Sequence, residues 1–377
     1  MSPTDLVEQL ATVPDPRVAR TRVHRLEEVL AIALLAAIDG ADGWDDIADF
    51  AEDRESWLRA FLDLPGGLPC ADTYRRVFEA IDTAALGACL TAMTSGLTAD
   101  LSGRVVAIDG KTMRRSFDRR SGISALHVVS AWVADRGITL GQIVTDEKSN
   151  EITAIPELLK TIDVKGAIVT IDAMGCQKKI AASIVDAGAD YALALKDNHP
   201  TLRTEVEGVF AAAEAGELAT KKVKSFSVAS KGHGRREVRR VSVSQNVEAL
   251  SAAAEWRNLK SVVKVDRQRT VGDSTSTETA YYLSSLRLGP KAMEKAIRSH
   301  WSIENSLHWV LDVVFREDAC RVRSVGGATN LAALRKLALV LLSLEKSKPG
   351  MSIARKRKRA ARVPDYAFDV LSNISLV

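Results

Sequence analysis

Apolar residues in the first hundred positions recur with helical spacing. Between Leu26 and Leu34 they follow an i, i+3, i+4 pattern, which predicts one buried helix face. The same spacing predicts further helices over 44–62 and 74–81, and the sequence Pro65-Gly66-Gly67 breaks the chain between them. We therefore expect an N-terminal helical region over residues 1–98, which serves either as a DNA-binding module or as a packing collar.

After residue 98 the pattern changes to short apolar runs that alternate with amphipathic stretches. Strands are predicted at 104–108, 125–134, 138–145, 167–171 and 191–195, and helices at 151–162, 177–187 and 201–213. The order β-β-β-α-β-α-β-α corresponds to three antiparallel strands followed by two right-handed crossovers. We therefore predict an α/β fold, an RNase H-like mixed sheet flanked by helices, whose first part spans residues 99–218.

The pattern changes again over residues 219–289. Four strands are predicted there without helices between them, at 223–228, 237–243, 261–265 and 279–283. Helical periodicity returns at Pro290 and continues past Trp309. We expect residues 219–289 to be a β-rich insertion before the last catalytic helix. Residues 290–377 would then complete the core and end in a basic segment.

Charge is distributed unevenly along the chain. The net charge is +4, but residues 1–100 contain 18 acidic and 8 basic side chains, a net of −10, so the rest carries +14. Residues 221–240 alone contain eight Lys or Arg and one Glu. This density favours a nucleic acid as partner for the later part of the chain, although a solvated hairpin could carry the same charges. The acidic balance of residues 1–98 slightly favours the packing collar.

Several classes of protein are disfavoured. Cys70, Cys89, Cys176 and Cys320 lie far apart and form no CxxC pair, so neither a zinc ribbon nor a disulfide framework is indicated. The N-terminus lacks a signal-peptide pattern, and the longest apolar run, 29–38, has only ten residues, too few to span a membrane. We expect a soluble cytoplasmic protein without a membrane partner.

Two aspartates follow buried strands. Asp109 ends the run Val105-Val106-Ala107-Ile108, and Asp172 ends the run 167–171. Ligands of open α/β sheets bind beyond the carboxyl ends of the strands, so both side chains are expected at one edge. A buried carboxylate is costly unless it is compensated. A turn or helix cap would explain either residue alone, and for the pair we favour a divalent metal ion.

A third carboxylate is expected from a later helix. Glu304 is the best candidate, and Asp312, Glu317 and Asp318 are alternatives. Carboxylates combined with water and phosphate oxygens suit Mg²⁺, for which Mn²⁺ would substitute. Two such ions can activate a water or a 3′-hydroxyl and stabilise the leaving oxygen.

Two histidines flank Glu304 at helical spacing. His300, Glu304 and His308 follow an i, i+4, i+8 pattern, which suggests a zinc site on one helix face. Three ligands on one straight helix would spread over about 12 Å and could not all reach one ion. We therefore expect the histidines to contact phosphate or to orient Glu304. Trp256 could stack on an extruded base, but core packing is the more common role for a lone Trp.

Several sequence blocks carry a resemblance to a known family. They are Asp15-Pro16-Arg17, Asp72-Thr73-Tyr74-Arg75-Arg76-Val77-Phe78, Ala107-Ile108-Asp109-Gly110-Lys111, Lys148-Ser149-Asn150-Glu151, Thr170-Ile171-Asp172-Ala173-Met174, Leu195-Lys196-Asp197-Asn198-His199-Pro200, Gly232-His233-Gly234-Arg235-Arg236-Glu237 and His300-Trp301-Ser302-Ile303-Glu304-Asn305-Ser306-Leu307-His308-Trp309. With these blocks the chain resembles the bacterial insertion-sequence transposases of the DDE type. Within them it resembles the ISAs-type group, which includes the H-repeat-associated proteins. The blocks span nearly the whole chain.

The resemblance implies catalysis by metal-bound carboxylates. It places the catalytic and metal-binding acids at Asp109, Asp172 and Glu304, with Mg²⁺ as the cofactor. It also implies cleavage of transposon-end DNA and strand transfer into target DNA, by a homodimer assembled on double-stranded DNA in the nucleoid region of the cytoplasm. Two other functions stay open: a catalytically inactive DNA-binding remnant of a mobile element, and a structure-specific nuclease.

The chain departs from the broader family around Glu304. That family has Tyr and Arg seven and four residues before the Glu and Lys seven residues after it, where this chain has Ile297, His300 and Leu311. Phosphate contacts are therefore expected from other groups. The candidates for DNA binding are Lys111, Lys196, Arg235, Arg236, Arg298, His300 and His308.

Overall fold

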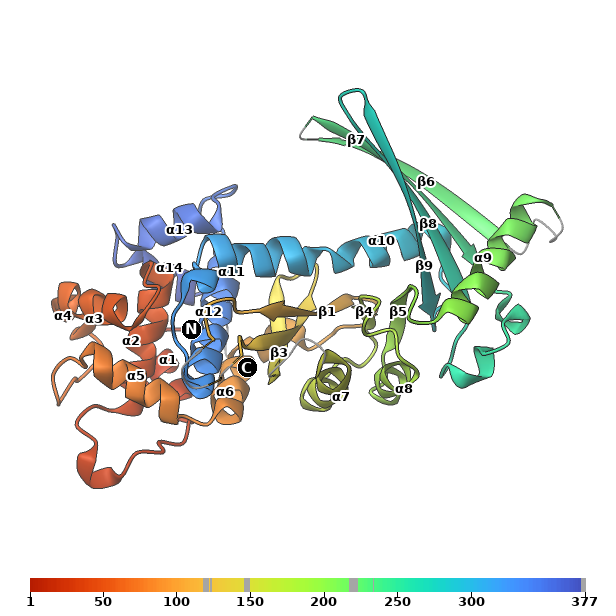
Figure 1. Cartoon of the computed structure of the whole chain (residues 1–377). Coiled ribbons are helices and arrows are strands. Elements are labelled where there is room, and N and C mark those ends of the chain that lie inside the picture. The colour runs from red at the N-terminus through yellow and green to blue at the C-terminus, as the bar shows by residue number, and fades with distance from the viewer. Residues whose placement is uncertain (118–121, 123, 146–149, 217–222, 233, 374–377) are drawn as a thin grey trace.

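A nine-stranded sheet runs through the part of the chain that the computed structural model describes, residues 1–117, 122, 124–145, 150–216, 223–232 and 234–373 (Figure 1). The strand order is β3-β2-β1-β4-β5-β9-β8-β7-β6. The strands are β1 (Val105–Thr112), β2 (His127–Val133), β3 (Ile138–Thr145), β4 (Ile168–Ile171), β5 (Asp190–Leu195), β6 (Val223–Gly232), β7 (Arg235–Ser244), β8 (Ser261–Val271) and β9 (Ser274–Ser284).

The first five strands form the predicted RNase H-like sheet. β1, β2 and β3 are antiparallel neighbours, and β4 and β5 add in parallel beside β1. The crossovers pass through α7 (Glu151–Thr161) and α8 (Lys178–Asp186). Helices cover both faces of this part of the sheet, and all four residues of β4 are buried. A strand in this position suits a continuous apolar run, and 168–171 is apolar apart from Thr170.

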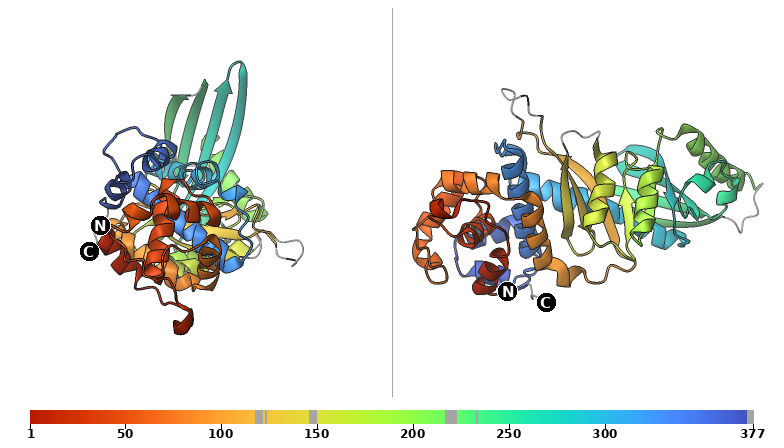
Figure 2. Two further views of the ribbon diagram at one scale, coloured as in Figure 1. Left: turned by 90° about the vertical axis from the view of Figure 1, so that its left-hand side faces the viewer. Right: turned by 90° about the horizontal axis from the view of Figure 1, so that it is seen from below.

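The β-rich insertion continues the same sheet. After α9 (Pro200–Glu214), strands β6 to β9 form antiparallel pairs, and β9 joins the core by pairing with β5. The strands are ten or eleven residues long, so the predicted bounds were too short. The outer half of β9, for example, is exposed and polar, and therefore lacks an apolar alternation. Figures 1 and 2 show this four-stranded ribbon standing away from the rest of the molecule.

Helices cover the two faces of the core sheet differently. α10 (Pro290–His300) crosses one face, and α7 and α8 lie on the other (Figure 1). Met293 and Ile297 of α10 pack against Val263 and Val265 of β8 and Ala192 of β5. α10 therefore links the insertion to the core.

The two ends of the chain share one helical core. It contains α1 (Pro3–Leu10), α2 (Leu26–Asp39), α3 (Trp44–Asp53), α4 (Glu55–Leu58), α5 (Ala71–Ala80), α6 (Thr83–Thr98), α12 (Val325–Leu344), α13 (Ile353–Ala360) and α14 (Tyr366–Leu371). The prediction of a single helix over 44–62 was wrong because the helix breaks at Arg54, which has φ −114° and ψ 13°. After the break, Trp57 stacks on Phe368 of α14 with ring centroids 4.8 Å apart.

α12 is the central helix of this helical core. Within the described residues it is the one unbroken helix whose length and hydropathy suit a membrane span, and 78% of that stretch is buried inside the protein. α5 and α6, joined by a 97° bend, pass the same test as a pair.

The basic segment near the C-terminus is partly structural. Lys356 and Arg357 of α13 are 5% and 6% exposed. Arg357 donates hydrogen bonds to the carbonyl oxygens of Ala37 and Ala41, at the end of α2, over 3.1 and 3.2 Å. The carbonyl oxygens at a helix C-terminus have no hydrogen-bond donors within the helix. Arg357 therefore supplies donors to carbonyl oxygens at the end of α2.

Candidate active site

The two aspartates lie side by side on neighbouring parallel strands. Ile108 of β1 is in register with Ile171 of β4, so Asp109 and Asp172 follow at the same level. Asp109 does not end its strand as predicted, since β1 continues to Thr112 along β2. Burial raises the pKa of Asp109 to about 7, and the charges of Asp172, Glu151 and Glu304 add to this effect.

A tight turn holds Asp172. Its Oδ1 accepts hydrogen bonds from the backbone N–H groups of Met174 at 3.0 Å and Gly175 at 3.3 Å. A β-carbon at Gly175 would lie 2.3 Å from Cγ2 of Ile171, so the turn has no room for a side chain there. The carboxylate is therefore oriented by the backbone before any ligand binds.

Glu304 lies in a π-helical turn. α10 ends at His300, and residues Ile303–His308 form a π-helix that leads into α11 (Trp309–Val313). Such turns occur often at functional sites. Partial burial, followed by the charge of Asp172, raises the pKa of Glu304, so this side chain is within electrostatic range of the aspartates.

The two flanking histidines point to different strands. Nδ1 of His300 lies 3.1 Å from Oγ1 of Thr170 on β4, and Nδ1 of His308 lies 3.5 Å from Oδ2 of Asp109 on β1. Burial is the main cause that lowers the pKa of His308 to about 3, which keeps the imidazole neutral. Both rings therefore contact the sheet, and the prediction that they contact phosphate or orient Glu304 stays a prediction.

The donor set suits a hard divalent cation. Asp109 and Asp172 offer carboxylate oxygens, and their mutual repulsion is what a bound cation would relieve. Among the residues that the structure describes, no three His, Cys, Asp or Glu side chains are close enough together to hold one ion. The aspartate pair therefore fits a metal ion, while Glu304 does not complete a three-ligand cluster in this conformation.

A cavity of about 310 Å³ opens beside Asp172 and Glu304. Its walls come from β4, β5, α9, β8, β9, α10 and the residues that follow α10, and they combine aromatic rings with cations. The relevant side chains are Lys196, Arg203, Arg267, Tyr281, Tyr282 and Trp301. The guanidinium of Arg267 lies 5.5 Å from the centre of the Trp301 ring. Rings can stack on a base and cations can pair with phosphate, so this cavity suits a nucleotide.

Sequence reasoning missed most of this cavity. Of its aromatic and basic residues, only Lys196 was predicted to bind DNA. Arg267 and Tyr281 lie on β8 and β9 of the insertion, and the sequence offers no signal that these strands reach the core. The pairing of β5 with β9 brings them to the candidate active site.

Lys111 is occupied by an acidic cluster. Its Nζ lies 2.7 Å from Asp312, 2.8 Å from Glu317 and 3.3 Å from Asp318, and its side chain is 10% exposed. Burial disfavours the charged ammonium, but Glu317 and Asp312 outweigh it and raise the pKa of Lys111. The ammonium of Lys111 is therefore occupied by these acids in the structure, and its predicted phosphate contact stays a prediction. The three acids, which were alternatives to Glu304, are likewise bound to Lys111.

The other predicted cations face solvent. Lys196 is exposed at the cavity, and Arg298 on α10 is exposed as well. Arg235 and Arg236 are exposed at the start of β7, near the far end of the ribbon. Lys221, Lys222 and His233 lie outside the described residues.

Trp256 has the core role that was favoured for it. It is 2% exposed and packs against the ring of His199, with ring centroids 5.2 Å apart.

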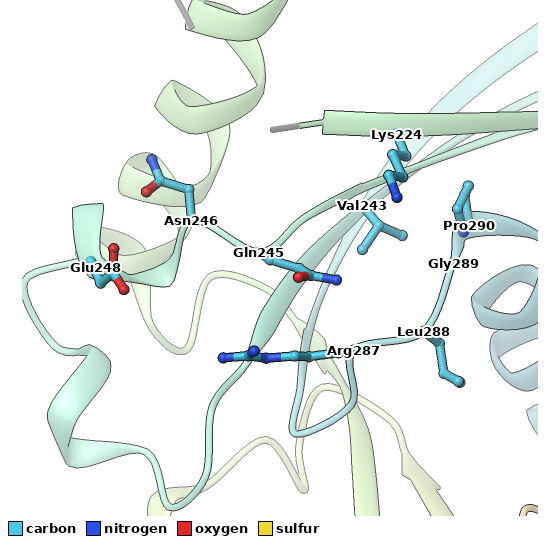
Figure 3. A pocket seen from close by; sticks show the side chains of 9 residues that line it. All are labelled: Lys224, Val243, Gln245, Asn246, Glu248, Arg287, Leu288, Gly289 and Pro290. Atoms are coloured by element: carbon cyan, nitrogen blue, oxygen red, sulfur yellow. The ribbon is translucent and has the colours of Figure 1, made fainter. Parts of the chain in front are cut away.

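A second cavity, of about 390 Å³, lies between the insertion and the start of α10 (Figure 3). Lys224, Arg287, Gln245, Asn246 and Glu248 are among its lining residues. None of the three candidate catalytic acids lines it, and its charges are mixed.

Comparisons with known proteins cover nearly the whole chain. Residues 7–94 match a family described as DDE_Tnp_1-associated, and residues 100–341 match the family described as Transposase DDE domain. The chain is 40% identical over 380 residues to putative transposase YncI of Escherichia coli O157:H7, covering 100% of this chain and 96% of that protein. It is 37% identical over 377 residues to H repeat-associated putative transposase YhhI of Escherichia coli K12, covering 98% of each.

The chain also has a distant likeness to a solved transposase structure. That structure is a piggyBac transposase synaptic complex with hairpin DNA, matched with a TM-score of 0.39 and 10% identity over 97% of this chain and 78% of that chain.

Proposed function

The chain belongs to the family of transposases with a DDE domain, and we propose that it cleaves the ends of its own mobile element and joins them to target DNA. Asp109, Asp172 and Glu304 are the proposed catalytic carboxylates. The observation that carries this proposal is the register of β1 and β4, which puts the two aspartates side by side, within electrostatic range of the glutamate.

Asp109 and Asp172 would hold a divalent cation, Mg²⁺ or in its place Mn²⁺, with Glu304 approaching from the π-helical turn. When bound, the cation supplies charge stabilisation and activates the attacking oxygen. The protein supplies orientation. Backbone N–H groups hold Asp172, and neutral His308 lies against Asp109. Preorganised groups of this kind lower the barrier because they need not reorganise during the reaction.

The cavity beside Asp172 would hold the nucleotides next to the cleaved bond. Lys196 is exposed at this cavity and Arg298 is exposed on α10, and both are proposed to contact the DNA backbone. We further propose that two copies of the chain act together on double-stranded DNA. Sedimentation of the protein with and without an end duplex tests this, and a complex with one copy per duplex would contradict it.

The direct test uses a labelled duplex with the terminal sequence of the element that carries this gene. With Mg²⁺, we expect cleavage at the element's end and joining of the freed 3′-hydroxyl to an unlabelled target, both abolished by a chelator. Binding without cleavage in Mg²⁺ or Mn²⁺ would support the inactive remnant. Cleavage combined with failure to join pre-cut ends would support the structure-specific nuclease.

Arg235 and Arg236 are proposed to contact DNA phosphates from the ribbon. Replacing both by Ala should weaken binding to all sequences and reduce the slope of log K against log salt by about 2, since each lost phosphate contact removes roughly 0.9. Fluorescence anisotropy over a range of salt concentrations measures both effects. Arg257→Ala, an exposed arginine paired with Asp186, is the control. An unchanged slope in the double variant would remove the ribbon from the DNA interface.

A further inference from the structure

A buried histidine and glutamate lie directly against β1, on the face opposite Asp109. His127 of β2 and Glu151, the first residue of α7, are 1% and 3% exposed. Nε2 of His127 and Oε1 of Glu151 are 2.5 Å apart, and Nδ1 of His127 lies 3.0 Å from Oγ1 of Thr112. The imidazole therefore bridges the end of β1 to the start of α7.

The pair packs against the residue that follows Asp109. A β-carbon built on Gly110 would lie 2.1 Å from Nε2 of His127 and 2.3 Å from Oε1 of Glu151. Only a glycine therefore leaves room for the pair at this position. Neighbouring residues of a strand point to opposite faces, so whatever holds Gly110 and Thr112 from one side also determines how Asp109 projects from the other.

Stability alone does not require this pair. An ionisable pair in a protein interior costs desolvation, and apolar residues of similar volume often replace such a pair without loss of stability. The start of α7 favours the negative charge of Glu151 through the helix dipole, but that gain is equally available to an exposed carboxylate. A hydrogen-bonded pair differs from apolar packing in one respect, which is that it defines a single orientation of the groups it joins.

We propose that His127 and Glu151 are positioning residues for Asp109. They hold the backbone at Gly110 and Thr112, and thereby keep the Asp109 carboxylate beside Asp172. The inference rests on the proposed catalytic role of Asp109 and extends it to two residues that contact neither substrate nor metal. It also gives a role to Glu151 in the block 148–151, of which residues 148 and 149 lie outside the described residues.

The test compares Glu151→Ala with Glu151→Gln. The Ala variant should lower the rate of end cleavage by about 10- to 100-fold, raise the Mg²⁺ concentration for half-maximal cleavage, and leave the Kd for DNA unchanged, as is usual when support for a metal ligand is lost. The Gln variant keeps a hydrogen-bond acceptor for His127. Its rate of end cleavage should therefore stay within about threefold of the wild-type rate.

Glu345→Ala is a matched control. Glu345 is equally buried, at 2% exposure, and accepts a hydrogen bond from Tyr366 at 2.6 Å, but it lies in the helical core. Its loss should lower the melting temperature without changing the Mg²⁺ dependence. If Glu151→Ala does not fold, Thr112→Val removes the other partner of His127 and should shift the Mg²⁺ dependence in the same direction.

A second measurement separates this inference from the proposed function. Mn²⁺ binding, followed by electron paramagnetic resonance without DNA, should weaken in Glu151→Ala and more strongly in Asp109→Ala. Unchanged Mn²⁺ binding in Glu151→Ala overturns the positioning role even if the wild type cleaves no DNA. A Gln variant as impaired as the Ala variant also overturns it, because the charge of Glu151 rather than its hydrogen bond would then matter. Wild-type protein that binds Mn²⁺ but does not cleave contradicts the proposed function alone.

Discussion

Asp172→Asn is expected to lower the rate of end cleavage by about a thousandfold or more, equivalent to about 4 kcal/mol of lost transition-state stabilisation. The amide keeps the size of the side chain and can still accept the hydrogen bonds of Met174 and Gly175. It removes the charge that would bind the divalent cation beside Asp109. The measurement is single-turnover cleavage of the end duplex, with DNA affinity determined in parallel and expected to stay within about threefold, because such interactions act mainly in the transition state.

The same loss is expected for Asp109→Asn and Glu304→Gln, and Asp318→Asn is the matched control. Asp318 is another partly exposed acid near the site, but it pairs with Lys111 and Arg114. Its replacement should change the rate only a few fold. Full activity in Asp172→Asn would remove this residue from the catalytic set. An active Glu304→Gln beside an inactive Asp318→Asn would show that the third carboxylate was wrongly assigned.

Arg357→Ala should cost about 3–5 kcal/mol of the free energy of unfolding, the usual penalty for removing one partner of a buried ion pair, because Arg357 pairs with Asp42 at 3.4 Å. Its guanidinium donates to the carbonyl oxygens of Ala37, Ala41 and Val314 and lies 4.3 Å from the ring centre of Phe315. The Ala variant removes the donor from these carbonyl oxygens, of which that of Ala37 is buried, and opens a void between α2 and α13. Urea denaturation, followed by circular dichroism, measures the change in the free energy of unfolding.

Lys358→Ala is the control for Arg357→Ala. Lys358 is the next residue of the same basic run and is exposed. Its loss should change the free energy of unfolding by less than about 0.5 kcal/mol, as for most surface positions. Equal effects of the two substitutions would show that the run has no structural role.

The core sheet could be predicted because its signals are local. The apolar run before Asp172 contains only residues suited to a strand buried on both faces, and β4 was predicted to within one residue. The same reasoning placed Asp109 and Asp172 after neighbouring strands, and the register of β1 with β4 confirms that they lie side by side. Glu304 was the best candidate among several acids of the later helices, and the family resemblance pointed to the same residue.

Long-range partners could not be predicted in this way. Lys111 lies on β1, two residues after Asp109, and was expected to contact phosphate, yet it pairs with Glu317, 206 residues later. His308 was expected to contact phosphate or to orient Glu304, and the sequence did not indicate that it would lie against Asp109. Strand alternation determines which face of the sheet a side chain occupies, but it does not determine which distant helix brings a charge to that face.

The sequence by itself therefore determined the order of the core elements, the two aspartates and, through resemblance, the family. Those features depend on periodicity and on contiguous motifs. The tertiary structure decided that the insertion extends the core sheet, that Arg357 supports α2, and that Glu151 and His127 lie against Gly110. Each of these depends on contacts between segments far apart in the chain, where packing and burial select the partner of a polar group.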